Sequence, residues 1–257
     1  MPTPLGAHNP RVQAARALLT KKGRAEQGRF SFEGSTLLGE AVDAGLPIAE
    51  IYATDQAYEA TAVLRDLEAA GTEIYVVDAR TIARLSDVET PTGLVAVAPI
   101  RLAPLETVFA RPGVVLILAG LTDPGNAGTL LRSAQAFGAT AVLFGTGSVD
   151  PYLPKVARSA MGALFRLPVA TASPSQAAAA LEGWRMTGLD ASGEPIGSLE
   201  WGQREALVVG AERAGLGPWA PLCTRLAAIP MPGAAESLNA AAAGSIALYE
   251  AAGRRSV

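Results

Sequence analysis

The chain has 257 residues, 49% of them hydrophobic and 18% charged, and a formal net charge of −3, values typical of a globular protein with one or two domains. It has no uninterrupted apolar run of about 18 residues, as a transmembrane helix needs, and it begins without an apolar signal segment. We therefore expect no membrane partner and a cytoplasmic location. The single cysteine, Cys223, excludes an internal disulfide. With one histidine, His8, the chain has few of the residues that a Ser-His-Asp triad or a zinc cluster needs.

Residues 1–105 alternate short helical and strand patterns. Asn9 and Pro10 predict the start of a helix whose apolar spacing continues to Gly23, and Ser35 is the predicted cap of a later helix. The remaining expected elements are strands at 29–34, 48–54, 73–78 and 92–100 and helices at 35–45, 59–71 and 79–86. This pattern predicts a small α/β domain, followed by a proline-containing linker at 101–113.

The pattern changes after the linker. The run "VVLILAGL" (114–121) is almost entirely apolar, as expected for a strand buried on both faces of a parallel sheet. Further strands are predicted at 139–145, 165–170, 185–190, 206–211 and 225–230, and helices at 127–137, 155–163, 174–183 and 238–252. Alternating strands and helices predict a parallel α/β domain over 106–257, with its ligands beyond the carboxyl ends of the strands.

Three segments that follow predicted strands carry polar residues. In "LTDPGNAGTLLRSAQAFGA" (121–139), Asn126 and Arg132 can face one cleft. In "VGAERAGLG" (209–217), glycines and alanines bracket one carboxylate, Glu212. In "IPMPGAAESLN" (229–239), Ser237 is the expected helix cap, which leaves Asn239 in the first turn, where a ligand suits it better than the backbone does. Taken singly, each segment is also compatible with an ordinary turn, a surface side chain or a plain cap.

Basic residues gather near the start of the chain despite the negative net charge. Residues 1–30 hold six of them against one acid, Glu26, a local charge of +5. Such a cluster is either a site for RNA phosphates or a solvated helix face. Its members are Arg11, Arg16, Lys21, Lys22, Arg24 and Arg29.

Three segments together resemble the three motifs of the SpoU/TrmH family of RNA ribose methyltransferases, within the SPOUT superfamily. They are "DPGNAGTLLRSAQAFGA", "VVGAERAGL" and "IPMPGAAESLNAAAAGSIALYE", in that order, and the resemblance covers residues 114–252. The intervening "VARSAMGALFRLPV" is similar to the family's linker, and "KKGR" and "FEG" are similar to marks of the small RNA-binding domain that many members carry. One departure is "SLNAAAAG", which has alanines where many members have Val and Ser after the Asn.

The resemblance implies a fold and a chemistry. Members of this family tie the C-terminal segment into a deep trefoil knot that holds S-adenosylmethionine, and they form homodimers through the last helix. Methyl transfer to a ribose 2′-hydroxyl is implied, which needs no metal. Motif position implies that Arg132 binds the substrate phosphate and assists proton removal, although a guanidinium is a poor base. The implied catalytic set is Arg132, Asn126, Glu212, Ser237 and Asn239, and the implied cofactor set is Gly210, Ile229, Met231 and Leu238.

The acceptor and the RNA class follow less directly. Methylation of a pyrimidine carbon would require a cysteine nucleophile, whereas Cys223 lies in an apolar context, so oxygen or exocyclic nitrogen is favoured. A separate N-terminal domain resembles the ribosomal RNA enzymes of the family and predicts large-subunit (23S) ribosomal RNA as substrate. The alternatives are a tRNA 2′-O-methyltransferase, a non-catalytic RNA-binding protein, and a nicotinamide-dependent oxidoreductase, which the missing GxGxxG fingerprint disfavours.

Overall fold

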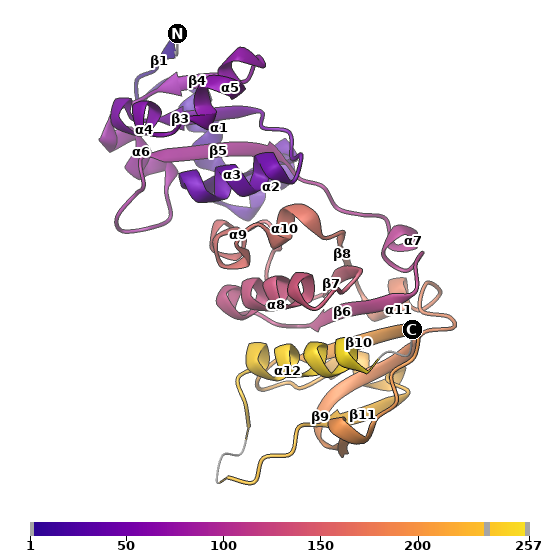
Figure 1. Cartoon of the computed structure of the whole chain (residues 1–257). Coiled ribbons are helices and arrows are strands. Elements are labelled where there is room, and N and C mark those ends of the chain that lie inside the picture. Colours follow the sequence, from indigo (N-terminus) through magenta and orange to yellow (C-terminus); the bar gives the residue numbers. More distant parts are fainter. Residues whose placement is uncertain (1–2, 234–236, 255–257) are drawn as a thin grey trace. The chain divides into compact units, whose positions relative to one another are not determined.

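The computed structural model describes residues 3–233 and 237–254. The chain divides into two compact units, Met1–Ile100 with Tyr152–Phe165, and Arg101–Pro151 with Arg166–Val257; Figure 1 labels their elements. The sequence prediction placed one division near residue 105 and did not foresee that 152–165 groups with the first unit. Within the described ranges, no helix is both long and apolar enough to cross a membrane.

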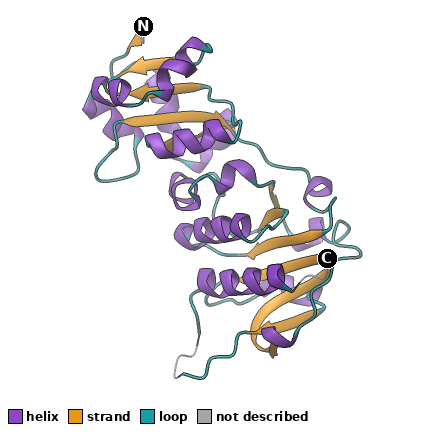
Figure 2. Cartoon of the chain, in the orientation of Figure 1, coloured by secondary structure: helices purple, strands orange, loops and turns teal. Residues whose placement is uncertain are grey.

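The first unit is built on a five-stranded mixed sheet. Its strand order is β1-β4-β3-β5-β2, with β1, β4 and β3 parallel and β5 antiparallel to both of its neighbours. The strands are β1 Thr3–Pro4, β2 Arg29–Glu33, β3 Glu50–Ala53, β4 Glu73–Val76 and β5 Leu94–Pro99. The helices, purple in Figure 2, are α1 Pro10–Ala17, α2 Lys21–Gln27, α3 Ser35–Asp43, α4 Asp55–Ala60, α5 Val63–Ala69 and α6 Ala79–Leu85.

Local capping explains where the helices of this unit depart from the prediction. Asn9 caps α1 as expected, since its side chain accepts from the N–H of Arg11. The helix does not continue to Gly23, because Thr20 caps a second helix, α2, whose Gly23 lies so close to α1 that a Cβ there would be 2.1 Å from the carbonyl oxygen of Ala17.

Two other expectations for this unit were wrong. The predicted helix at 59–71 is two helices, α4 and α5, because the backbone of Thr61 is extended at the end of α4. The cap of α3 is Gly34 and not Ser35. Gly34 has a φ of +102°, a conformation that glycine adopts without strain.

The second unit is a six-stranded parallel sheet, as predicted, of order β11-β9-β10-β6-β7-β8. The strands are β6 Gly113–Ala119, β7 Ala141–Gly145, β8 Val169–Ala172, β9 Arg185–Pro195, β10 Arg204–Gly210 and β11 Arg225–Ala228. The helices from residue 101 onward are α7 Leu105–Val108, α8 Pro124–Ala136, α9 Pro154–Ala160, α10 Ala163–Arg166, α11 Pro174–Ala177, α12 Ala240–Gly253, and the 3-10 turns η1 Ile196–Ser198 and η2 Gly217–Leu222.

Three predictions for this half of the chain need correction. The expected strand at 165–170 starts only at Val169, because residues 163–166 are helical. The expected helix at 174–183 is confined to Pro174–Ala177. The expected linker at 101–113 contains α7, and the N–H of Ala103 donates to the carbonyl of Val169, so this segment is part of the folded unit.

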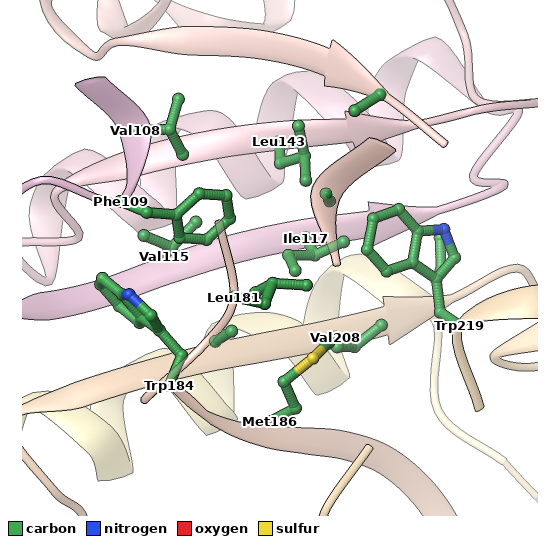
Figure 3. Packing of buried hydrophobic residues seen from close by; sticks show 14 of the residues in the cluster. Val108, Phe109, Val115, Ile117, Leu143, Leu181, Trp184, Met186, Val208 and Trp219 are labelled. Carbon is green, nitrogen blue, oxygen red and sulfur yellow. The ribbon is translucent and has the colours of Figure 1, made fainter. Parts of the chain in front are cut away.

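The core of the second unit lies on both faces of the sheet. Every residue of β6 is buried, which confirms the prediction of a doubly covered strand. On one face, Val115 and Ile117 of β6 pack with Leu143, Val208 and the large side chains shown in Figure 3. These large side chains are Phe109, Trp184, Met186 and Trp219.

On the other face, α12 packs tightly against α8. A Cβ on Gly244 of α12 would lie 2.4 Å from Cδ2 of Leu130 and 3.1 Å from Cγ2 of Val209, so any larger residue would have to displace the buried Leu130 side chain. The hydroxyls of Ser133 and Ser245 are hydrogen-bonded at 2.7 Å across the two helices. The chain therefore returns from β11, at the edge of the sheet, to a helix beside β6 and β10 near its middle.

A buried carboxylate joins the amino-terminal ends of three strands. Glu205 of β10 is 0% exposed, and its Oε1 accepts from the N–H of Gly202 at 2.7 Å. The same oxygen lies 3.4 Å from Nη2 of Arg225, in β11, and 3.6 Å from Nη1 of Arg185, in β9. Burial raises the pKa of Glu205 above its ordinary value even though both arginines favour the charged form.

Candidate active site

The first predicted site residue, Asn126, lies in the first turn of α8, directly after the carboxyl end of β6. Asp123 caps this helix and accepts from the N–H of Asn126 at 2.6 Å, and Pro124 occupies the first helical position. The cap fixes the backbone on which the Asn126 side chain is carried. The start of this helix was predicted at residue 127, although an Asp followed by Pro is itself a helix-start signal.

Three of the predicted polar side chains meet in one chain of hydrogen bonds. Nδ2 of Asn126 donates to Oε1 of Glu212 at 2.6 Å, and Nδ2 of Asn239 donates to Oδ1 of Asn126 at 3.0 Å. A carboxylate only accepts, so it fixes which way the Asn126 amide points. We call Asn126, Glu212 and Asn239 the amide–carboxylate cluster; it unites the ends of β6 and β10 with the start of α12.

Asn239 is also the cap of α12, which corrects the sequence interpretation. Its Oδ1 accepts from the N–H groups of Ala241 at 2.9 Å and Ala242 at 3.2 Å. Ser237 was the expected cap, and Asn239 was expected inside the first turn. The argument that Asn239 would compete with the helical backbone was therefore wrong, while its amide nitrogen does point at a side-chain partner, Asn126.

Arg132 and Ser237 are not part of the cluster. Arg132 is exposed on α8, six residues after Asn126, and Ser237 is exposed just before α12. Neither side chain makes a hydrogen bond or an ion pair with any residue in the part of the chain that the structure describes. The structure thus brings together three of the five expected catalytic residues and leaves one guanidinium and one hydroxyl available to a ligand.

The four expected cofactor residues lie in two loops at the carboxyl ends of β10 and β11. Gly210 ends β10, and Ala211 and Gly215 exchange backbone hydrogen bonds of 3.0 and 2.9 Å across the turn that follows. A Cβ on Gly210 would lie 2.3 Å from the carbonyl carbon of Gly215, so this tight turn requires glycine.

Ile229, Met231 and Leu238 lie beyond β11, outside helices and strands. Within the described residues, their backbone N–H and C=O groups have no hydrogen-bond partner, and Leu238 is 38% exposed. Free backbone donors and acceptors beside apolar side chains suit a neutral heterocycle and its ribose, so this donor set fits the nucleoside of S-adenosylmethionine.

The predicted basic cluster is only partly available to RNA. Arg24 is 2% exposed and its Nη1 donates to the carbonyl of Leu18 at 2.8 Å, so its assignment to RNA binding is corrected: it supports the turn between α1 and α2. Arg11 is paired with Glu73 at 2.8 Å, and Arg29 lies 3.8 Å from Glu50. The remaining cations are exposed on α1 and α2: Arg16, Lys21 and Lys22.

The lone thiol is unsuited to nucleophilic chemistry. Cys223 is half-buried and packs against the core shown in Figure 3. Burial raises the pKa of its thiol to about 11, so the reactive thiolate is scarce near neutral pH. This agrees with the sequence argument that the acceptor is not a carbon that needs a cysteine.

Replacing Asn239 with alanine is expected to lower the free energy of unfolding by about 1 kcal/mol, because α12 loses its cap. Asn239→Asp keeps an oxygen for the two N–H groups and should retain most of the stability, while it loses the amide that donates to Asn126. Urea denaturation of both variants checks this. Equal stability of the alanine variant and the original chain would contradict the capping role.

With its polar cluster at the carboxyl edge of a parallel sheet, this unit has the architecture of an α/β enzyme. Residues 113–249 match the model of the SpoU rRNA Methylase family, and residues 9–96 match that of the MRM3-like substrate binding domain. The chain belongs to the SpoU rRNA methylase family.

Relatives of known name match almost the whole chain. It is 34% identical to the 23S rRNA (guanosine(2553)-2′-O)-methyltransferase RlmP of Bacillus subtilis, over 96% of this chain and 98% of that protein. It is 32% identical to the 23S rRNA (uridine(2479)-2′-O)-methyltransferase of Streptomyces viridochromogenes, over 97% of this chain and 91% of that protein.

Solved structures match over a similar share. An AdoMet-bound rRNA methyltransferase from Sinorhizobium meliloti superposes with a TM-score of 0.87 at 28% identity, over 97% of both chains. The SpoU methyltransferase AviRb from Streptomyces viridochromogenes, in complex with AdoMet, superposes with a TM-score of 0.86 at 32% identity, over 95% of this chain and 97% of that one.

Proposed function

We propose that this chain is an S-adenosylmethionine-dependent methyltransferase that acts on a ribose 2′-hydroxyl of 23S ribosomal RNA. Both named relatives above carry this reaction in their names, and both of their matches extend over the two units. The single observation that carries the proposal is the amide–carboxylate cluster, which unites Asn126, Glu212 and Asn239 from three distant parts of the chain. Acting on ribosomal RNA would place the enzyme in the cytoplasm.

Each residue of the proposed active site has its own role in the reaction. When bound, S-adenosylmethionine supplies an electrophilic methyl group for a single in-line displacement by the ribose oxygen. Arg132, with its unengaged guanidinium, clamps the phosphate beside that ribose through paired N–H groups and assists removal of the 2′-hydroxyl proton. The cluster holds the acceptor nucleotide in line, because Glu212 and Asn239 prevent rotation of the Asn126 amide. Ser237, just before α12, contributes a hydroxyl to the same site.

Two features implied by the family belong to the same proposal. We place the methyl donor against the backbone of Gly210, Ile229, Met231 and Leu238, in a knotted C-terminal segment. The return of the chain from β11 to α12, beside α8, is the path that such a knot needs. A crystal structure with S-adenosylmethionine would test it: an unthreaded path or a donor bound elsewhere would contradict the assignment.

A homodimer through α12 is also proposed. Ile246 and Tyr249 of α12 are 38% and 61% exposed. The Tyr249 ring meets Phe137, the residue after α8, edge-on at 5.7 Å. These side chains form an apolar patch on the outer face of the helix, which a second copy would cover. Sedimentation equilibrium at micromolar concentration should give twice the chain mass of 26.3 kDa; a mass of one chain would argue against the dimer.

The experiment for the function is methyl transfer from tritiated S-adenosylmethionine to unmodified RNA. We expect label in 23S ribosomal RNA transcribed in vitro, recovered in a dinucleotide that resists alkaline hydrolysis because its 2′-oxygen is blocked. Transfer RNA in a parallel reaction should remain unlabelled. Label confined to transfer RNA would favour the tRNA alternative, and RNA binding without any label would favour a non-catalytic protein.

A further inference from the structure

An open cleft of about 460 Å³ lies in the first unit, within the range of small-ligand sites. It is bounded by the start of α3, the segment from the end of β3 into α4, one face of α6, and the loop that leads into β5. Gly93 of that loop has a φ of +86°, and a Cβ there would lie 3.0 Å from Oγ1 of Thr54. The loop is therefore held tightly against α4, which gives the cleft a defined wall.

The lining is polar and largely unengaged. The side chains of Ser35, Gln56, Thr61 and Thr92 line the cleft and make no hydrogen bond with other described residues. Oγ1 of Thr54 accepts from the N–H of Ala57 at 3.2 Å and still has a proton to donate. The cleft thus presents both donors and acceptors on neutral groups, the chemistry that recognises the edge of a base or the hydroxyls of a ribose.

The charges around the cleft favour the base and ribose of a nucleotide over its phosphate. The described lining contains no ionisable side chain, and the carboxylates of Asp55 and Asp78 stand at the starts of α4 and α6, where they would repel a phosphate inside. Arg80 and Arg84 are exposed on α6. Helical geometry places Arg80 about 100°, and Arg84 about 150°, from the middle of the face that lines the cleft, so Arg80 can reach a phosphate that continues past its rim and Arg84 points away.

We propose that this cleft binds an unpaired nucleotide of the substrate RNA, with its base and ribose inside and a flanking phosphate toward Arg80. Unpaired nucleotides are what proteins read by hydrogen bonds in RNA. This inference rests on the proposed function and locates its recognition step. It moves the main RNA contact of the first unit away from the N-terminal basic cluster, in which Arg24 is buried and Arg11 is paired.

The test uses the full-length chain and 23S ribosomal RNA transcribed in vitro. Ala83 is exposed on α6 and lines the cleft, so Ala83→Phe fills the space without entering the core. We expect filter binding to show an affinity for the RNA that is lower by about tenfold or more, equivalent to a few lost contacts. Binding of S-adenosylmethionine should be unchanged. Ala69→Phe, at an exposed position of α5 outside the cleft, is the matched control and should bind RNA normally.

A second variant keeps the test valid if Ala83→Phe fails to fold. Gln56→Ala combined with Thr92→Val removes two unengaged polar groups and should weaken RNA binding in the same direction. Normal RNA affinity in both cleft variants would overturn the cleft assignment while leaving the proposed function intact. Failure of the unchanged chain to bind ribosomal RNA, with normal binding of S-adenosylmethionine, would overturn the proposed function and the cleft with it.

Discussion

Replacing Arg132 with alanine is expected to reduce the rate of methyl transfer by about 100-fold or more, the scale of losses when a group that positions substrate or moves a proton is removed. Arg132 is exposed, and its side chain makes no hydrogen bond or ion pair with the described residues. Its loss should therefore leave the unfolding transition and the binding of S-adenosylmethionine unchanged. The measurement is single-turnover transfer of tritiated methyl to 23S ribosomal RNA, beside calorimetric titration with the methyl donor.

Two further variants separate charge from geometry. Arg132→Lys keeps a positive charge but lacks the planar pair of N–H groups that grips a phosphate, so it should recover only a minor part of the rate. Arg111→Ala removes an exposed arginine just before β6, at the opposite end of that strand, and should have no effect on the rate. Unchanged methylation by the alanine variant would remove Arg132 from the mechanism.

The fold was predictable where burial alone decides the pattern. The apolar run at 114–121 predicted a strand covered on both faces, and all of β6 is buried. Element ends were less predictable, because they depend on single contacts. The break between α1 and α2 depends on how closely Gly23 lies to Ala17, a tertiary contact that periodicity does not record.

The site was predictable as a set of residues but not as an arrangement. Strand-end positions identified Asn126, Glu212 and Asn239, since the carboxyl ends of parallel strands share one edge. The cap of α12 was assigned to Ser237, because Ser and Asn are similarly good caps and only coordinates distinguish them. The prediction of the RNA-binding residues from local charge included too many of them for a similar reason. The sequence shows that Arg24 is a cation but does not show that it is buried.

Deletion of residues 1–105 would be a poor test of RNA recognition. Tyr152 and Phe165, which group with this unit, pack against Phe30 at ring distances of 4.8 and 6.3 Å. Deleting residues 1–105 would expose these rings, so a loss of activity could reflect instability. The substitutions in the cleft avoid this difficulty.

The buried carboxylate Glu205 gives the largest expected effect on stability. Glu205→Ala removes the acceptor for the N–H of Gly202 and the partner of Arg225, whose side chain is 16% exposed. Breaking a buried pair on one side costs about 3–5 kcal/mol. We expect about 3, because the side chain of Arg185 is 45% exposed and water can replace its partner.

Urea denaturation checks this, with Glu182→Ala as control, since Glu182 is exposed in the same half of the chain and should change stability by less than about 0.5 kcal/mol. A loss below about 1 kcal/mol for Glu205→Ala would show that the network contributes little to holding the three strands together.

The pH dependence of Glu205 follows from the direction of its pKa. Burial raises that pKa above the ordinary 4.5, despite the attraction of Arg225 and Arg185, so the folded chain binds this proton more tightly than the unfolded chain does. The stability that the group contributes is therefore fully present below pH 4.5 and is lost as the pH rises through the folded pKa.

Glu205→Gln keeps an oxygen for the N–H of Gly202 but does not titrate. The unfolding free energy of the original chain, minus that of Glu205→Gln, should thus fall as the pH rises above 4.5, while the contributions of shared groups cancel. A difference that instead rises with pH would mean that the two arginines outweigh burial, and that Glu205 is held in the core by its charge.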